Sequence, residues 1–267
     1  MQNLRKILEK TFVADLEHHA AIGSTNDRAS QCAGSADVKL PLLIIADRQT
    51  AGRGRGSNRW WTGPGSLAFS LLIGPELVAP VGASAGGLQR SGLVSLAAAL
   101  AIVEAVAPLA PGHEIGIHWP NDVMLDGRKL AGILIEVLPD GKHVIGIGLN
   151  VNNVAADAPD DVRPRVVTLR DATGREHDST DLLIAILQQI QRRFAALAIA
   201  PESIAMRAQE LCLQRGKRLQ IVQGEKRIEG RCLGIAADGA LLIEADGKQQ
   251  AVYSGVVRCV ESLDPTA

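Results

Sequence analysis

Two Asp-Gly pairs, Asp126-Gly127 and Asp140-Gly141, divide one stretch of the chain into three apolar segments, residues 123–125, 130–138 and 143–151. Asp-Gly is favoured in tight hairpin turns because both residues tolerate the positive φ angles that such turns require. The sequence therefore predicts a three-stranded antiparallel meander. Apolar runs of strand length and segments with helical spacing surround it, so we expect an α+β domain. The expected strands are residues 12–16, 42–47, 67–73 and 115–119, and the expected helices are residues 1–12, 92–107, 180–197 and 201–213, with one more beginning at Ser24, which has capping-box spacing to Asp27.

The pattern changes near residue 214. Short apolar segments then recur at regular spacing, separated by turn residues such as Asp238-Gly239 and Asp246-Gly247. They lie at residues 218–222, 227–235, 240–244, 249–253 and 256–260. About fifty residues of this kind form a small β-barrel or sandwich with little core of its own, so we expect it to dock on its neighbour. The predicted division is a large domain of residues 1–213 and a small one of residues 214–267.

Composition excludes several classes of protein. The formal net charge of −1 gives no reason to expect a long nucleic acid as partner. The four cysteines form no CxxC pair, which argues against a zinc site and a secreted disulfide framework. The amino-terminal segment mixes charged and apolar residues, unlike a signal peptide, and Glu104 interrupts the longest apolar stretch, residues 93–110. We therefore expect a cytoplasmic protein without a membrane span.

A glycine-spaced arginine loop, residues 49–60, lies between two predicted strands. Four arginines and no acidic residue occur from Arg48 to Arg59. Glycine lets backbone NH groups approach a ligand, and arginine adds permanent charge, so the loop can hold an anion. An isolated Arg-Gly segment is also typical of RNA-binding tails, which are repetitive and disordered. Trp60 at the end of the loop could stack on a planar ligand or anchor the loop on the core.

Two further clusters carry chemical groups. In residues 118–132, Asn121 and Asp122 offer oxygen ligands suited to Mg²⁺. Lys129 opens an apolar strand there, as a functional cation or as a turn residue that points to solvent. In residues 146–152, glycines at alternate positions leave one strand face without side chains. That face could accept a flat ligand, or it could pack tightly against another part of the chain.

These clusters together supply positive charge, NH-rich loops, oxygen ligands for a metal and apolar walls. The sequence lacks the Walker loop, the dinucleotide-binding GxGxxG, the HExxH zinc motif and the GxSxG nucleophile elbow. Phosphoryl and nucleotidyl transfer depend mainly on positioning and charge neutralisation. An enzyme that activates a carboxylate with ATP could therefore work with these residues and without a protein nucleophile.

The sequence resembles the biotin protein ligases, which attach biotin to acetyl-CoA carboxylase. The resemblance covers nearly the whole chain and rests on five motifs in the family's order: Ser24-Thr25-Asn26, Gln49 with Gly52-Arg53-Gly54-Arg55, Trp119-Pro120-Asn121-Asp122, Lys129-Leu130-Ala131-Gly132, and residues 146–150. It implies a mixed sheet with flanking helices, like the catalytic core of class II aminoacyl-tRNA synthetases, followed by a small SH3-like barrel.

The resemblance also implies a site and a reaction. Biotin and ATP would react, with Mg²⁺, to biotinyl-5′-AMP and pyrophosphate, and a lysine of the biotin carboxyl carrier protein would then take the biotin. Lys129 and Arg55 would be the catalytic residues, and Asn121 and Asp122 would hold the metal. Biotin or the adenylate would contact Ser24, Thr25, Asn26, Gln49, Gly52, Arg53, Gly54, Arg55, Lys129, Gly132 and Gly148. ATP would contact Arg55, Trp60, Asn121, Lys129 and Asn150.

The chain departs from the family pattern in two places. His118 stands where members commonly have lysine, so a permanent charge is missing there at neutral pH. Gly56-Ser57-Asn58 replaces a more basic segment, which predicts a weaker hold on the adenylate. Only 23 residues precede Ser24, too few for the winged-helix domain of longer members, so we expect no DNA binding. Some members pair as homodimers. The alternatives are a lipoate ligase of the same general fold and a non-catalytic biotin- or RNA-binding module.

Overall fold

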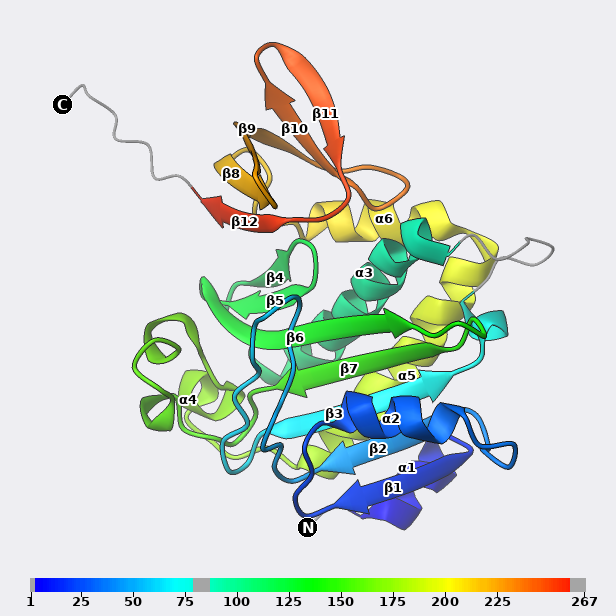
Figure 1. The fold of residues 1–267 in the computed structure, drawn as a ribbon. Coiled ribbons are helices and arrows are strands. Elements are labelled where there is room, and N and C mark those ends of the chain that lie inside the picture. Colours follow the sequence, from blue (N-terminus) through cyan, green and yellow to red (C-terminus); the bar gives the residue numbers. More distant parts are fainter. Residues whose placement is uncertain (1–2, 79–86, 260–267) are drawn as a thin grey trace.

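The computed structural model describes residues 3–78 and 87–259 and contains two sheets (Figure 1). The larger sheet has seven strands in the order β1-β2-β3-β7-β6-β5-β4. β1 pairs with β2 in parallel and all other neighbours are antiparallel, so the sheet is mixed. The strands are Asp15–His19 (β1), Leu42–Ala46 (β2), Leu67–Ile73 (β3), Ile115–His118 (β4), Asp122–Leu125 (β5), Arg128–Val137 (β6) and His143–Leu149 (β7). The predicted antiparallel meander is confirmed as β5, β6 and β7.

Strand β1 lies three residues beyond its predicted place. The prediction followed the apolar run 12–16, whereas the strand contains Glu17, His18 and His19. β1 is an edge strand with β2 as its neighbour, so charged and polar side chains are tolerated there and the apolar pattern fails to mark it.

Helices cover the two faces of the large sheet unequally. One face packs against α3 (Gly87–Val106) and α5 (Ser179–Ile199), and the other carries α2 (Thr25–Ala33) (Figure 1). Successive strand residues divide between the faces as the pleat requires. Leu43, Ile45 and Leu71 belong to the large core under α3 and α5. Their neighbours Ile44 and Leu72 belong to a small cluster with Ala29 and Ala33 of α2.

The remaining helices are short or peripheral: α1 (Leu4–Lys10), α4 (Leu169–Thr173) and α6 (Pro201–Glu210). The sequence missed α4, whose five residues are too few for a helical repeat. The predicted capping box is wrong, because Ser24 caps α2 without a side-chain hydrogen bond and Asp27 pairs elsewhere. Helix α3 also begins five residues before the predicted start.

Two helical segments, Ser91–Leu109 and Ser179–Ile199, are long and apolar enough to cross a membrane by composition. Their most apolar windows are 72% and 44% buried inside the fold. Glu104, which interrupts the first segment, pairs with Arg193 of the second. These two segments are core helices that pack on the sheet and on each other.

The carboxyl-terminal part forms the second sheet, five antiparallel strands in the order β11-β10-β9-β8-β12. Its strands are Arg218–Gln223 (β8), Lys226–Ile235 (β9), Leu241–Ala245 (β10), Lys248–Val252 (β11) and Val256–Cys259 (β12). The five predicted strands are confirmed, apart from residue 260, which lies outside the described residues. Together the two sheets and their helices confirm the α+β fold class.

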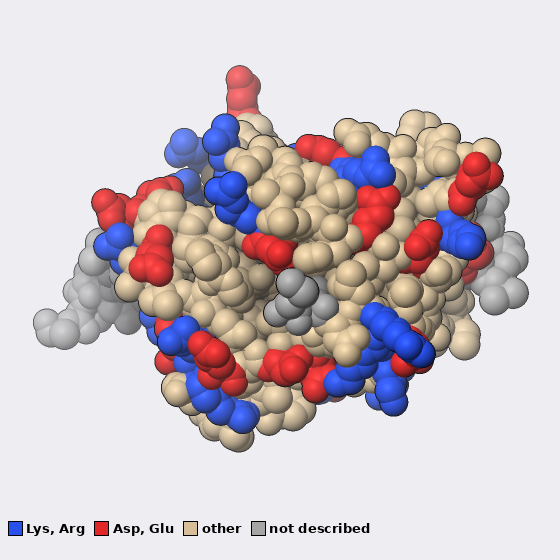
Figure 2. Space-filling model, turned by 90° about the horizontal axis from the view of Figure 1, so that it is seen from below, with Lys and Arg blue, Asp and Glu red and all other residues tan. Residues whose placement is uncertain are grey.

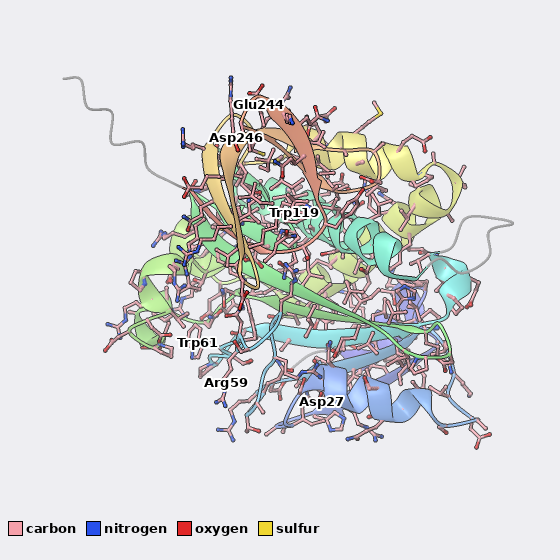
Figure 3. All side chains as sticks on the ribbon, turned by 45° about the horizontal axis from the view of Figure 1, so that its top comes forward. Asp27, Arg59, Trp61, Trp119, Glu244 and Asp246 are labelled. Carbon is pink, nitrogen blue, oxygen red and sulfur yellow. The ribbon has the colours of Figure 1, made fainter. Side chains whose placement is uncertain are left out.

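The small sheet is fixed to the large one through Trp119 and Gln214. The Trp119 indole Nε1 donates a hydrogen bond of 3.0 Å to the Gly239 carbonyl, and Gln214 Oε1 accepts from the Trp119 backbone NH at 2.6 Å. Both residues are buried. Figure 3 marks Trp119 where the two sheets meet. The expected docking of the small domain is therefore present, and its contact residue Trp119 directly follows His118 in the chain.

Candidate active site

The glycines of β6 and β7 form one continuous bare patch on the sheet. Gly132 lies opposite Gly148 in the strand register, and Gly146 lies two residues before Gly148 on β7, on the same face. Side chains from elsewhere fill the space above them. A Cβ at Gly148 would overlap the Trp60 indole, and a Cβ at Gly146 would overlap the Asn26 amide. This glycine face therefore packs tightly, which was one of the two alternatives that the sequence left open.

The loop of residues 52–60 forms a small hairpin-like turn. The Gly54 NH donates to the Asn58 carbonyl at 2.9 Å, and the Trp60 NH donates to the Gly52 carbonyl at 3.0 Å. Gly56 has a φ of +62°, which glycine adopts at little cost. Figure 1 shows the segment between β2 and β3 crossing the sheet over β7 and β6, on the face that carries α2. Trp60 thus anchors a single ordered loop, and these contacts are unlike those of a repetitive RNA-binding tail.

A buried hydrogen-bond network lies at the start of α2. Gln49 Oε1 accepts from the Thr25 backbone NH at 2.8 Å and from the Thr25 hydroxyl at 3.1 Å. Ser70 donates to Thr25 Oγ1 or Asn26 Oδ1, at 2.7 and 2.6 Å. Ser24 is buried beside them. Residues from α2, β3 and the arginine loop therefore converge, and Ser70 is a member that the motifs did not reveal.

The two arginines of the Gly-Arg-Gly-Arg segment have different surroundings. Arg53 pairs with Asp27 of α2 and with Glu136 of β6, and both carboxylates raise its pKa. Arg55 makes no side-chain hydrogen bond or salt bridge with any described residue, although Asp122 acts on it electrostatically. Burial lowers the pKa of Arg55, an arginine whose charge is nevertheless retained at neutral pH. Arg55 shares this lack of a side-chain partner with Arg59, but Arg59 is exposed, whereas Arg55 is half-buried on the side of Asp122 and is therefore the better placed of the two to meet an anion in the site.

Lys129 points inward, across the glycine face. Its Nζ lies 2.7 Å from Asp122 Oδ1 and 5.8 Å from the centre of the Trp60 ring. A Cβ at Gly132 would lie 3.1 Å from Lys129 Cε. The solvent-facing alternative is wrong for this lysine. With Arg55 and Lys129 against Asp122, two cations face one carboxylate, so this end of the site has one net positive charge.

The predicted metal ligands Asn121 and Asp122 lie at this cationic end. Asn121 Nδ2 donates a hydrogen bond of 2.7 Å to the Ile133 carbonyl. This bond holds the Asn121 amide against β6. Asp122 is engaged by Lys129. No group of three or more His, Cys, Asp or Glu side chains with metal-binding geometry occurs among the described residues. Asp122 fits a Mg²⁺ held largely by nucleotide phosphates, since such ions take one or two protein carboxylates and several non-protein oxygens.

Asn150 follows β7 and is buried beside another asparagine that the motifs did not include. Asn153 Nδ2 donates to Asn150 Oδ1 at 3.0 Å, while Asn153 Oδ1 is buried without a partner in the described structure. Thr62 and Ser66 also have buried hydroxyls without partners. Buried polar atoms of this kind cost free energy unless a ligand or water satisfies them. The repeated asparagines at 150, 152 and 153 were the available sequence signal.

His118 lies at the junction between the cationic end of the site and the small sheet. Its Nε2 is 3.4 Å from Gln214 Nε2, and Asp122 is its partner in the β4–β5 register. Burial lowers the pKa of His118, and the Lys129 and Lys217 cations lower it further, while Asp122 opposes them. The imidazole is therefore neutral at pH 7, as the sequence predicted.

Comparison with known proteins places this geometry in a family. Residues 19–152 match the biotin/lipoate A/B protein ligase family, and residues 216–258 match the biotin protein ligase C terminal domain. A biotin–[acetyl-CoA-carboxylase] ligase of Mycobacterium tuberculosis is 34% identical over 243 residues, covering 89% of this chain and 86% of the relative. The bifunctional ligase/repressor BirA of Bacillus subtilis is 30% identical and covers 90% of this chain and 72% of the relative.

A solved structure agrees with both domains of the fold. The biotin protein ligase of Aquifex aeolicus in complex with biotin and ATP has a TM-score of 0.78 at 26% identity, covering 92% of this chain and 100% of that one. The small-domain match and these relatives favour the biotin branch of the family over the lipoate branch. The chain therefore belongs to the biotin protein ligase family, which confirms the resemblance inferred from its motifs.

Proposed function

We propose that the protein activates biotin with ATP as biotinyl-5′-AMP and transfers it to a lysine of a biotin carboxyl carrier protein. One observation carries the proposal: Lys129 and the unpaired Arg55 lie at the end of a glycine face that the 52–60 loop covers. Two cations beside a covered surface suit the joining of two anions, a carboxylate and a polyphosphate.

The biotin subsite in this proposal lies beside the buried network of Thr25, Asn26 and Gln49. A ureido ring has two NH donors and one carbonyl acceptor, which amide and hydroxyl side chains can satisfy. The glycine face under Trp60 offers space to a flat ring if the indole shifts. Ser24, Gly52, Gly54 and Gly148 line the same region as backbone or small groups. This combination of apolar wall and few fixed polar groups is typical of small-molecule sites.

The nucleotide in this proposal lies toward Trp60, Asn121 and Asn150, with Arg55 and Lys129 between the two substrates. A Mg²⁺ at Asp122, with Asn121 beside it, would neutralise phosphate charge and help pyrophosphate to leave. The unpartnered Asn153 Oδ1 supports a ligand near Asn150, because a bound donor group would satisfy it.

The reaction has two balanced steps. A biotin carboxylate oxygen forms a bond to the α-phosphorus of ATP, and the bond to pyrophosphate breaks. Lys129 and Arg55 stabilise the negative charge that the two reactants bring together. A lysine amine of the carrier protein then attacks the carbonyl carbon of the adenylate, AMP leaves, and the amine loses a proton. Between the steps the 52–60 loop excludes water from the mixed anhydride.

Three further points complete the proposal. We assign residues 1–213 to the catalytic domain and residues 214–267 to the small domain. The homodimer stays a prediction. We place the enzyme in the cytoplasm, supported by the packing of both apolar helices in the core.

The test is pyrophosphate release from ATP with the purified protein, supplied in turn with biotin, lipoate or neither. Release that depends on biotin, followed by biotinylation of a carrier domain, is the expected result. Release that depends on lipoate alone would replace the proposal with the lipoate-ligase alternative. If neither compound supports release, the activity assigned here is wrong.

A further inference from the structure

Arg53 pairs with two carboxylates, in contrast to Arg55 and Arg59 of the same loop, which have no salt bridge among the described residues. Its Nη1 pairs with Asp27 of α2 and its Nη2 pairs with Glu136 of β6. Glu136 is the largest cause of the raised pKa of Arg53. The residues come from three separate segments, and Figure 3 marks Asp27 on α2, beneath the loop that carries Arg59 and Trp61. The loop is therefore tied to the sheet and to the helix through one guanidinium.

Glu136 has a second contact that Asp27 lacks. Its Oε2 accepts a hydrogen bond of 2.7 Å from Asn26 Nδ2, while its other oxygen faces Arg53. The Asn26 amide lies over Gly146, and its Oδ1 faces the Ser70 hydroxyl at 2.6 Å. With a carboxylate on one side and a hydroxyl on the other, the Asn26 amide has a defined orientation. Glu136 therefore connects the loop to the buried network that we assign to biotin.

The charges at the two ends of the glycine face are opposite. Arg53 stands between two carboxylates, so this cluster has one net negative charge. Arg55 and Lys129 stand with one carboxylate, so their end has one net positive charge. A substrate carboxylate is repelled from the first end and attracted to the second. Arg53 is thus unsuited to bind that carboxylate.

We propose that Glu136 is a positioning residue that latches the 52–60 loop over the glycine face through Arg53 and orients the Asn26 amide. The inference rests on the proposed function for its substrate, whereas the latch itself concerns the protein without substrate. Glu136 acts on biotin through Asn26 and the loop. The Arg53 side chain is 41% exposed, so salt weakens the latch without abolishing it.

The experiment compares Glu136→Gln with Glu17→Gln in the full chain. Glu136→Gln keeps an acceptor for Asn26 and removes the charge that faces Arg53. Glu17→Gln removes the carboxylate of another arginine pair, Glu17 with Arg28, away from the loop. It therefore controls for a general loss of stability. Trypsin cleaves after arginine, and the loop contains Arg53, Arg55 and Arg59.

The first readout is the rate at which trypsin cuts within residues 53–60 without substrate. We expect Glu136→Gln to raise this rate about tenfold over Glu17→Gln, because cleavage of a folded protein follows local opening. Sodium chloride should raise the rate in the unchanged protein and have a smaller effect in Glu136→Gln, where only the Arg53–Asp27 pair remains to be screened. Equal rates in the two variants would overturn the latch, whether or not the protein is a ligase.

The second readout separates binding from chemistry. Glu136→Gln should raise KM for biotin about fivefold and change kcat less than twofold, since the empty loop opens more often while bound substrates still draw the loop and Arg55 into place and Lys129 is untouched. Asp27→Asn removes the other carboxylate and leaves Asn26 alone, so it should raise cleavage with a smaller change in KM. An unchanged KM in Glu136→Gln, or an equal change in Glu17→Gln, would contradict the positioning role.

Discussion

The two faces of the seven-stranded sheet are built from different residues. The face under α3 and α5 is filled mostly by apolar side chains, which pack into the large core. The opposite face carries glycines at 132, 146 and 148, a buried hydrogen-bond network and the arginine loop. On the side of the molecule seen in Figure 2, acidic and basic residues are interspersed, which gives no extended basic surface there.

The difference separates residues that stabilise the fold from residues that we propose to bind a ligand. Side chains of the helix-covered face are mostly apolar, with His143 at the start of β7 as a buried polar exception, and their burial stabilises the domain. The glycine face gives up such burial and leaves polar atoms of Asn153, Thr62 and Trp60 without partners. Unsatisfied buried groups are uncommon in folded proteins, and a bound ligand or water is one way in which such groups are satisfied. Substitutions on the two faces should therefore fail in different ways.

The largest effect is expected for Lys129→Ala. The variant loses the cation that faces both reacting anions, so biotin-dependent pyrophosphate release should fall at least about 100-fold. Lys142→Ala is the matched control, because Lys142 also pairs with an aspartate, Asp140, in the turn between β6 and β7. A normal rate in Lys129→Ala, or an equal fall in both variants, would remove Lys129 from the mechanism.

Arg55→Gly should weaken the hold on the adenylate. Without this unpaired cation the mixed anhydride escapes about tenfold faster, because a charge-assisted contact worth about 1.4 kcal/mol or more is lost. Rapid filtration of labelled biotinyl-AMP measures the rate, and labelling of added unrelated proteins should rise. Arg59→Gly introduces the same flexible residue at an exposed arginine of the same loop and should change neither. Retention equal to that of the unchanged protein would refute the assignment of Arg55.

A pair of glycine substitutions tests the glycine face directly, with a helix glycine as the control. In Gly148→Ala the new Cβ overlaps the Trp60 indole, so the loop must move, and we expect pyrophosphate release to fall about tenfold. In Gly92→Ala, on α3, the new Cβ has no atom within 4 Å, and helix propensity should stabilise the fold by about 0.5–1 kcal/mol. Thermal unfolding and the activity assay distinguish the variants. Full activity in Gly148→Ala would show that the glycine face is not part of the site.

The smallest effect concerns His118 and pH. Burial lowers the pKa of His118, so the imidazole gains charge only below its ordinary value near about 6.5. Apparent affinity for ATP should improve about threefold between pH 7.5 and 5.5. His118→Lys should show the improved affinity already at pH 7.5 and a flatter pH profile. If KM for ATP is the same at pH 5.5 and 7.5 in both the unchanged protein and His118→Lys, then His118 lies away from the phosphates.

Local patterns predicted much of this structure. The Asp-Gly turns predicted the meander of β5 to β7, and the alternate glycines of β7 predicted a strand face without side chains. Such features depend on backbone conformation within a few residues, which sequence records directly. The same holds for the loop between β2 and β3.

Other features depend on residues far apart in the chain. Glu136 lies 83 residues from Arg53 along the chain and 110 residues from Asn26, and the sequence around Glu136 predicts neither contact. Asp27 was assigned to a capping box because its spacing to Ser24 fits, yet the tertiary pairing with Arg53 prevails. The predicted position of β1 was wrong for a related reason. An edge strand has a single neighbour, so it need not show the alternation of apolar residues that marks a central strand. The Glu136 carboxylate in an apolar strand was the one available signal.

The most direct test of the account is amide hydrogen exchange with and without biotin and ATP. The central claim is that the 52–60 loop closes over the adenylate on the glycine face while the helix-covered face stays unchanged. We expect exchange in residues 52–60 to slow about tenfold or more when both substrates are present, with helix α5 unaffected. Equal exchange of the loop in the two states, or slowing confined to α5, would contradict the claim.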